Sequence, residues 1–154
     1  MTLSGILPPK AVKVLSAPSS KKRLLHDIAD LAAGIYDLPA RGVLDALIER
    51  EGLGPTGVGH GVALPHARIP ELDRVVGLFV MLEKPIDYDA VDRQPVDITF
   101  SLFAPMEAGV MHLKALALVS RTLRNADLCN KLRANPDPAK LHAILTEAQA
   151  DKAA

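Results

Sequence analysis

A glycine-rich stretch that ends in a proline and a histidine constrains this chain more than any other feature of its sequence. The stretch runs from Glu51 to Arg68, and its first half holds Gly52, Gly54, Gly57, Gly59 and Gly61. A short apolar run, Val62 to Leu64, follows and stops at Pro65 and His66. Proline has a fixed φ and biases the residue before it toward an extended conformation. The chain therefore reaches His66 along a defined path, and we expect this histidine to take part in chemistry.

Length and composition favour one aliphatic domain. The chain has 154 residues, enough for one domain with a sizeable core, and 49% of them are hydrophobic although only 3% are aromatic. Lys plus Arg and Asp plus Glu number 18 each, so the formal net charge is zero. Nucleic-acid binders usually carry a basic surplus, so we expect no nucleic-acid partner. The basic run Lys21 to Arg23 is interpreted as a solvated helix face.

The chain has no feature of a secreted or membrane protein. Its single cysteine, Cys129, cannot form an internal disulfide, and we expect it to be a packing residue. The segment from Met1 to Pro9 does not have the pattern of a secretory signal. No apolar run approaches the ~20 residues that cross a bilayer. We expect a cytoplasmic protein without membrane insertion.

Hydrophobic spacing and turn residues predict an α/β domain. Strands are predicted at 11–15, 74–82 and 96–104, and helices at about 20–36, 39–52, 106–124, 126–134 and from 138 through Leu145. The strand at 74–82 is uniformly apolar, whereas 96–104 alternates like a half-covered strand, and 83–95 is predicted to be a polar loop. Because strands and helices interleave without a regular repeat, we expect one domain over residues 1–154. This domain has a mixed central β-sheet, helices on both faces, and flexible ends at about 1–9 and 149–154.

The stretch around His66 resembles the active-site signature of the mannitol/fructose/nitrogen-type IIA proteins of the bacterial phosphotransferase system. The matching pattern begins at an acidic residue, Glu51, continues with Val58 and Gly59, and ends with the run Val62 to Ala67, in which Leu64, Pro65 and His66 stand together. The resemblance extends from about Lys21 to Leu145 and is closest to the nitrogen-type regulators. It implies the same α/β fold.

The resemblance implies that His66 is phosphorylated. It also implies three supporting donors to the phosphoryl oxygens: His112 on the long helix, Arg50 in the segment before the glycines, and Thr56 in the glycine loop. Each has a simpler structural interpretation. His66 fits a strand-end histidine with a satisfied ring, His112 fits a buried histidine bonded to the backbone, and Arg50 fits a cation at a helix C-terminus.

Two other kinds of site are disfavoured. Gly52 to Gly57 spells G-x-G-x-x-G, but a dinucleotide fingerprint needs a strand before it and a helix after it, and here the order is reversed. We expect the glycines instead to turn the chain tightly and to bring backbone amides near a phosphoryl group. His60, His66 and His112 could form the metal site of a zinc hydrolase, but no cysteine or carboxylate with ligand spacing accompanies them. We expect no cofactor and no metal.

The predicted function is that of a phosphocarrier and regulator. His66 would accept a phosphoryl group from a histidine phosphocarrier protein of the HPr or NPr type in a phosphoenolpyruvate-dependent relay. Target proteins, with kinases and transporters as candidate classes, would respond to the phosphorylation state, so regulation is favoured over metabolic turnover. The alternatives are a sugar-specific IIA component that passes phosphate to a IIB partner, and a scaffold whose histidine is never modified. We expect partners to meet an apolar surface formed by residues near His66: Val62, Leu64, Ala67 and Ile69.

Overall fold

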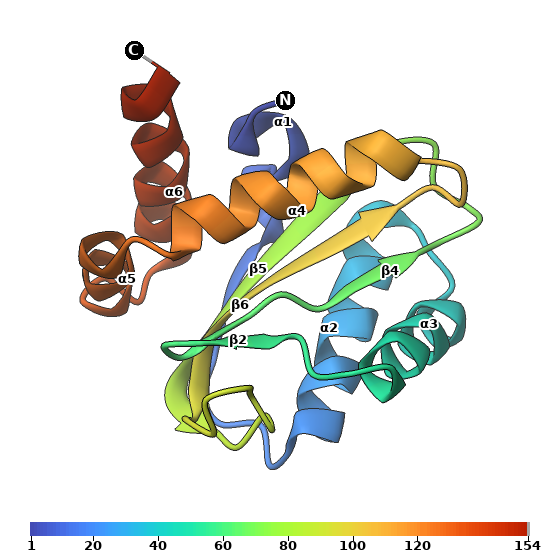
Figure 1. Cartoon of the computed structure of the whole chain (residues 1–154), viewed down its shortest axis with the longest axis horizontal. Coiled ribbons are helices and arrows are strands. Elements are labelled where there is room, and N and C mark those ends of the chain that lie inside the picture. Colours follow the sequence, from blue (N-terminus) through green and yellow to red (C-terminus); the bar gives the residue numbers. More distant parts are fainter. Residues whose placement is uncertain (154) are drawn as a thin grey trace.

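A computed structural model describes the backbone of residues 1–153 and the side chains of residues 1–147 (Figure 1). The strands are β1 (Val12–Leu15), β2 (Gly57–Gly59), β3 (Val62–Ala63), β4 (His66–Arg68), β5 (Val76–Ile86) and β6 (Val96–Ala104). The helices are α1 (Leu3–Ile6), α2 (Lys21–Tyr36), α3 (Ala40–Gly52), α4 (Gly109–Leu123), α5 (Ala126–Arg133) and α6 (Pro138–Ala153), and a 3-10 turn, η1, covers Pro9–Ala11.

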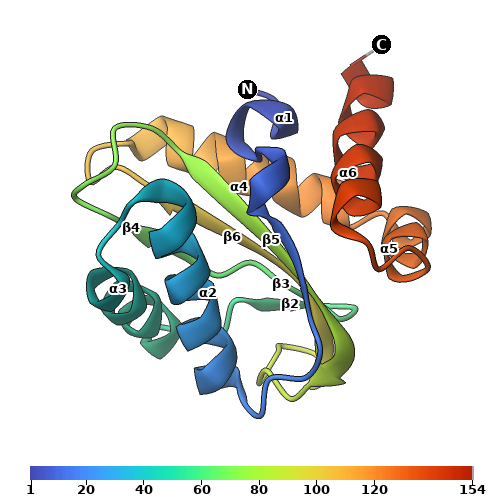
Figure 2. The same ribbon diagram turned by 180° about the vertical axis from the view of Figure 1, so that it is seen from behind.

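The strands form one mixed sheet in the order β1-β5-β6-β3-β2, with β4 also paired to β6. β1 is parallel to β5, β5 is antiparallel to β6, and both β3 and β4 run parallel to β6. Figures 1 and 2 show α4 on one face of the sheet and α2 and α3 on the opposite face. The predicted mixed sheet with helices on both faces is therefore confirmed.

The central strand β6 is covered on both faces, so the prediction of a half-covered strand was wrong. The polar side chains of Thr99 and Ser101 are fully buried. Thr99 Oγ1 donates to the Val80 carbonyl at 2.9 Å, which satisfies its hydroxyl inside the sheet. At the open end of the strand, the Asp97 carboxylate pairs with the Arg133 guanidinium at 2.9 Å. The buried Ser101 hydroxyl makes no hydrogen bond among the described residues. The alternation of polar residues along β6 therefore does not mark a solvated face.

The N-terminal segment forms part of the core, although the sequence predicted a flexible end at 1–9. The Thr2 hydroxyl accepts from the Gly5 amide and caps α1, and Leu3 and Leu7 are fully buried. His142 on α6 contacts the Leu7 carbonyl through Nε2 at 2.9 Å. A four-residue helix is too short to show a periodic pattern, which explains the missed element. The flexible end expected at 149–154 lies outside the residues whose side chains are described.

The connection between β5 and β6 packs against the glycine stretch. The sequence predicted a polar loop at 83–95, but β5 extends to Ile86 and the ring of Tyr88 is fully buried. A Cβ added to Gly57 would lie 2.6 Å from Ala90 Cβ, closer than real side chains approach. Gly57 therefore lets two segments of different elements come into backbone contact. Among the helices of the described residues, none is both long and apolar enough to cross a membrane.

Candidate functional site

The site begins at an interruption in the sheet. β3 and β4 both pair with β6, and Leu64 and Pro65 lie between them. Proline has no backbone N–H to offer to a ladder, but its carbonyl accepts from the Leu102 amide at 2.9 Å, so the chain stays attached to β6. His66 therefore opens β4 and does not end a strand. It is paired in register with Leu102, which fixes its backbone.

Two hydrogen bonds set the tautomer of His66. Its Nδ1 lies 2.9 Å from the Leu64 carbonyl oxygen, and its Nε2 lies 3.0 Å from Arg50 Nε. A carbonyl oxygen only accepts and a guanidinium only donates, so Nδ1 carries the proton and Nε2 presents a lone pair. The second contact comes from the last turn of α3, where Arg50 also donates through Nη1 to the Gly54 carbonyl at 3.0 Å. His66 is thus a neutral ring with its nucleophilic nitrogen covered by Arg50.

His112 stands beside His66 across a hollow of about 360 Å³, which we call the histidine hollow. The two ring centroids are 5.4 Å apart and the ring planes make an angle of 58°. His112 comes from the first turns of α4 and is only 6% exposed. The lining of the hollow comes from α3, β4, α4 and the segments between them: Ala46, Glu49, Arg50, Leu53, His66, Ala67, Arg68, Met106 and His112.

Both histidines are held in the neutral form. Burial lowers the pKa of His66; the Arg50 charge lowers it further, while the Leu64 carbonyl and Glu51 act in the opposite direction. Burial also lowers the pKa of His112 to about 4, with further contributions from His66 and Arg68. Protonating a histidine ring in a largely buried site beside an arginine costs free energy, because two positive charges would then lie close together away from water. Near neutral pH both rings are therefore uncharged, and a neutral imidazole is the form that can attack phosphorus.

His112 contains a polar atom without a partner. Among the described residues its Nδ1 is buried and makes no hydrogen bond. Burying an unpaired polar group costs about 1 to 3 kcal/mol, so such groups are rare. The Ser101 hydroxyl is another one among the described residues, and it does not line the hollow. One nitrogen of the ring that lines the hollow beside His66 is therefore left without a partner among the described residues.

Thr56 lies in a different arrangement, which we call the Glu51 cluster: Lys21, Glu51, Thr56 and Tyr88. The Thr56 hydroxyl donates to Glu51 Oε1, and its backbone amide donates to Glu51 Oε2 at 3.2 Å. The Tyr88 hydroxyl donates to Glu51 Oε1 at 3.1 Å. Lys21 Nζ lies 2.8 Å from Glu51 Oε2 and 4.5 Å from the centre of the Tyr88 ring. The structure thus brings together His66, His112 and Arg50 but turns the Thr56 hydroxyl toward Glu51.

The glycines also differ from the expectation. None of them lines the histidine hollow, and the Gly54 carbonyl takes part only by holding Arg50. Gly59 and Gly61 have φ values of 103° and 80° and form the turn between β2 and β3, with His60 between them at 57°. The glycines therefore serve turns and close packing, and their amides do not reach toward His66.

Three residues near the site were missed from the sequence. Arg68 lines the hollow. It comes two residues after His66, and on an extended strand this spacing places both side chains on the same face, so the sequence could have indicated it. Tyr88 could have been noticed as the one aromatic residue in an otherwise polar loop. Lys21 was interpreted as part of a solvated helix face, but its side chain is only 23% exposed and pairs with Glu51. A basic run gave no sign that one of its members turns inward.

The three histidines considered as zinc ligands are not gathered. His60 is exposed in the turn between β2 and β3, where its amide donates to Asp92 Oδ2 at 2.9 Å and its carbonyl accepts from Arg133. It is not part of the lining that His66 and His112 share. Within the part of the chain that is described, no group of three or more His, Cys, Asp or Glu side chains is arranged to hold a metal ion.

The apolar surface beside His66 is made by other residues than predicted. Val62, Leu64, Ala67 and Ile69 are all buried, so they cannot form a surface for a partner. Leu53 and Met106, which line the histidine hollow, are 83% and 55% exposed. The prediction named the wrong residues because apolar side chains along β3, β4 and the segments beside them are buried in the core. The exposed apolar residues come from the ends of α3 and β6.

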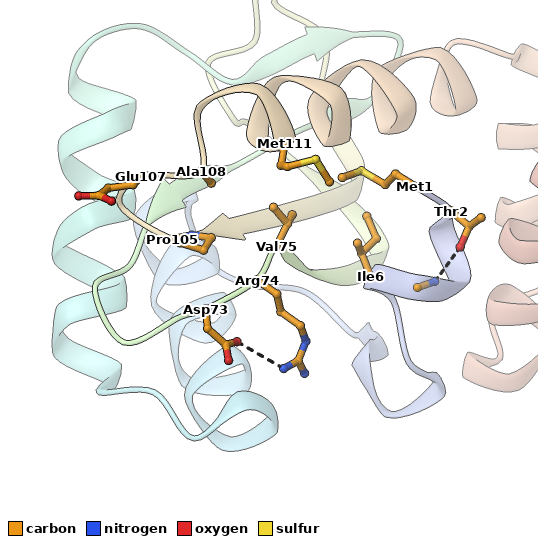
Figure 3. Close-up of a pocket in the computed structure, with 11 residues that line it drawn as sticks. Met1, Thr2, Ile6, Asp73, Arg74, Val75, Pro105, Glu107, Ala108 and Met111 are labelled. Atoms are coloured by element: carbon orange, nitrogen blue, oxygen red, sulfur yellow. Dashed lines mark hydrogen bonds and ion pairs between the residues drawn. The ribbon is translucent and has the colours of Figure 1, made fainter.

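A larger hollow, of about 650 Å³, lies on the other side of the connection from β6 to α4. Figure 3 shows the side chains of Ile6, Val75 and Met111 turned into it, with Arg74 and Asp73 at its edge. No histidine lines it. The larger hollow thus has none of the candidate site residues that line the smaller one.

Comparisons with known proteins agree with this geometry. The family described as "Phosphoenolpyruvate-dependent sugar phosphotransferase system, EIIA 2" matches residues 5–148. The chain is 42% identical over 145 residues to a nitrogen regulatory protein of Bradyrhizobium diazoefficiens, covering 94% of this chain and 95% of the relative. It is 39% identical over 150 residues to the nitrogen regulatory protein of Escherichia coli, covering 97% and 92%.

Among solved structures, the nitrogen regulatory protein IIA-Ntr of Neisseria meningitidis superposes with a TM-score of 0.85 at 33% sequence identity, over 93% of this chain and 98% of that one. The identity is high enough, and the coverage complete enough, for the likeness to extend beyond the fold. The predicted family is confirmed: this chain belongs to the EIIA type-2 family of the phosphoenolpyruvate-dependent phosphotransferase system.

Proposed function

We propose that this protein is a cytoplasmic phosphocarrier and regulator that accepts a phosphoryl group on Nε2 of His66 from a histidine phosphocarrier protein of the HPr or NPr type. The observation that carries the proposal is the fixed tautomer. Nδ1 is occupied by the Leu64 carbonyl, so only Nε2 has a lone pair, and it faces the histidine hollow. Membership of the EIIA type-2 family supports the same chemistry.

In the proposed transfer, the Nε2 lone pair attacks phosphorus in line. The phosphorus–nitrogen bond of the donor phosphohistidine breaks, and its electron pair stays on the donor ring. Arg50 must first leave Nε2, because its N–H covers the attacking lone pair at 3.0 Å. A guanidinium gains more from the anionic phosphoryl oxygens than from a neutral ring nitrogen, so the arriving group itself draws Arg50 away.

His112 acts in this scheme as a neutral donor. One of its ring nitrogens carries a proton, and phosphoryl oxygens are strong acceptors for it. A preorganised donor that becomes useful only as charge arrives stabilises the transition state more than the ground state. The position of the His112 ring, which lines the hollow with its centroid 5.4 Å from that of His66, supports this role. Thr56 enters the scheme through the loop that it anchors, as argued below.

Phosphorylation is the proposed regulatory signal. A phosphoryl group adds a charge of about −1.5 to −2 near neutral pH. That charge would appear beside the exposed side chains of Leu53 and Met106. A target protein that covers this apolar surface would have to bury the charge, which is costly unless the target offers cations. We expect phosphorylation to weaken target binding at least tenfold, about 1.4 kcal/mol.

The first experiment is labelling. Wild type, His66→Ala and His26→Ala are incubated with labelled phosphoenolpyruvate, enzyme I, a phosphocarrier and magnesium. We expect an acid-labile, base-stable phosphate on wild type and on His26→Ala, which changes an exposed histidine of α2, and none on His66→Ala. Equal labelling of His66→Ala and wild type would contradict the proposed acceptor.

The second experiment separates regulation from sugar uptake. A target captured with the unmodified protein is purified, and its affinity is measured for wild type, phosphorylated wild type and His66→Asp. Weaker binding of the last two supports the regulatory role. Equal affinities, together with rapid transfer of the phosphoryl group to a IIB partner, would favour a sugar-specific role instead.

A further inference from the structure

Two neighbouring residues at the end of α3 contact different parts of the protein. Arg50 and Glu51 are consecutive, so their directions differ by about 100° around the helix axis. Arg50 reaches His66, and Glu51 reaches the buried Thr56 and Tyr88. The histidine hollow and the Glu51 cluster are therefore joined through a single helical turn.

The Glu51 carboxylate is saturated with donors. Its Oε1 accepts from the Thr56 and Tyr88 hydroxyls, and its Oε2 accepts from the Thr56 amide and from Lys21. The side chain is only 8% exposed, whereas Thr56 and Tyr88 are 4% and 0% exposed. Four donors match the four acceptor positions of a carboxylate, so this buried group has no capacity left for a ligand.

The cluster holds the loop on which Arg50 depends. Between α3 and β2 the chain passes through Leu53, Gly54, Pro55 and Thr56, and Glu51 binds Thr56 at both its amide and its hydroxyl. Two residues earlier, the Gly54 carbonyl accepts from Arg50 Nη1 at 3.0 Å. The same guanidinium then donates through Nε to His66. A continuous path of hydrogen bonds runs from Tyr88 and Thr56 through Glu51 and the loop to the reactive ring.

We propose that Glu51, Thr56 and Tyr88 are positioning residues: they lock the Leu53–Thr56 loop so that the Gly54 carbonyl aims the Arg50 guanidinium at Nε2 of His66. This inference rests on the proposed phosphoryl transfer to His66. None of the three touches the reacting atoms. A loop that contains a glycine has no stiffness of its own at that residue, so the carbonyl of Gly54 keeps its direction only if the loop is held at both ends. Displacing a positioning group by about an ångström can cost up to about 100-fold in rate.

The test uses two substitutions that change no charge. Thr56→Val removes a hydroxyl and keeps the side-chain size, and Tyr88→Phe removes one oxygen and keeps the buried ring. For each variant, two quantities are measured: the rate of transfer from a phosphorylated phosphocarrier, and the pKa of the His66 ring by NMR. We expect transfer at least about tenfold slower than in wild type, within the roughly 100-fold that misplacement can cost.

The pKa of His66 distinguishes positioning from general weakening of the fold. Arg50 lowers this pKa by its charge, so a guanidinium that has moved away from the ring should let the pKa rise toward its ordinary value. Because neither substitution alters a charge, a rise can come only from a change in geometry. Thr56→Ser keeps the hydroxyl and should restore both the transfer rate and the pKa.

Two matched controls report the cost of losing a buried hydroxyl elsewhere. Tyr36→Phe removes the hydroxyl that donates to the Gly77 carbonyl, and Thr122→Val removes the one that donates to the Leu118 carbonyl. Both should reduce thermal stability and leave the transfer rate and the pKa of His66 at their wild-type values. If Thr56→Val does not fold, Tyr88→Phe carries the test alone.

The inference is overturned if Tyr88→Phe and Thr56→Val behave like these controls, with lower stability but an unchanged rate and an unchanged pKa of His66. A failure of the proposed function has a different signature, since wild type itself would then take no label. The pKa measurement needs no transfer, so the positioning role is tested in either case.

Discussion

The Glu51 cluster and the histidine hollow are neighbours that differ in how their polar groups are satisfied. In the cluster, the carboxylate accepts from four donors. In the hollow, His112 Nδ1 has no partner among the described residues, and Nε2 of His66 has the Arg50 guanidinium as its partner. A saturated cluster stabilises one geometry, whereas an unsatisfied one lowers stability and is available to a ligand. The comparison separates polar groups that hold the fold, which have all their partners, from polar groups that are candidates for binding a ligand, which do not.

The largest expected effect is on the rate of phosphoryl transfer in Arg50→Ala. This change removes the guanidinium donor of the hollow, and losing one preorganised donor costs about 100- to 1,000-fold in rate, or about 2.7 to 4 kcal/mol. Arg41→Ala is the control, because it removes an exposed arginine from the same helix. Single-turnover labelling measures both. Equal rates for the two variants would remove Arg50 from the mechanism.

The hollow should also make stability depend on pH in the acid range. The pKa of His112 is about 4 in the folded protein against an ordinary 6.5, so below pH 6.5 the unfolded chain binds more protons. Stability is therefore fully present above pH 6.5 and falls as the pH drops toward 4. The loss reaches up to about 3 kcal/mol, since a pKa difference of one corresponds to about 1.4 kcal/mol.

Denaturant unfolding at a series of pH values measures this effect. His112→Gln should flatten the profile between pH 6.5 and pH 4. The slope that remains should come mainly from His66, whose pKa is also lowered. A profile identical to that of wild type would mean that His112 is not held neutral by its surroundings.

The packing beside the Glu51 cluster can be disturbed without changing a polar group. Gly57→Ala would place a Cβ 2.6 Å from Ala90 Cβ, and we expect a loss of about 1 to 3 kcal/mol, as for other overpacked sites. Gly34→Ala is the matched control, since nothing lies within 4 Å of a Cβ there, and it should stabilise α2 by about 0.5 to 1 kcal/mol. Thermal unfolding compares the two. A Gly57→Ala protein as stable as wild type would show that this contact relaxes freely.

The smallest expected effect is seen by comparing two ion pairs made by residues of α2. Lys21 lies over the buried Tyr88 and pairs with Glu51, whereas Arg23 pairs with Asp27 and its side chain is 56% exposed. Lys21→Met should cost about 1 to 2 kcal/mol, because it removes a charged donor from a nearly buried acceptor. Arg23→Met should cost only about 0.3 to 0.5 kcal/mol. Similar losses in both would mean that solvent screens Glu51 as it screens the surface.

Much of the fold followed from patterns that extend over many residues. The helices at α2, α3 and α4 and the long strands β5 and β6 have periodic or continuous apolar residues, and all five were predicted within a few residues. Among the short elements, β1 was predicted, and the apolar run before Pro65 covers β3, but α1, with four residues, and β2 and β4, with three each, were missed. These depend on contacts with distant segments, which leave no periodic signal.

The histidines were predicted from a motif, but their surroundings were not. Thr56 and Arg50 were both assigned to the phosphoryl group, yet only Arg50 lines the hollow. The sequence did not indicate that Tyr88, 32 positions after Thr56, would be buried against the same carboxylate. Spacing along one element predicts which side chains share a face, whereas a cluster assembled from α2, α3 and two loops is decided by packing.

The gap between β3 and β4 also limits how the length of this chain can vary. Both strands are attached to β6, and only Leu64 and Pro65 separate them. Side chains alternate along extended backbone, so inserting or deleting one residue here would turn His66 toward the opposite face of the sheet. For His66, the number of residues that precede it matters as much as their identity.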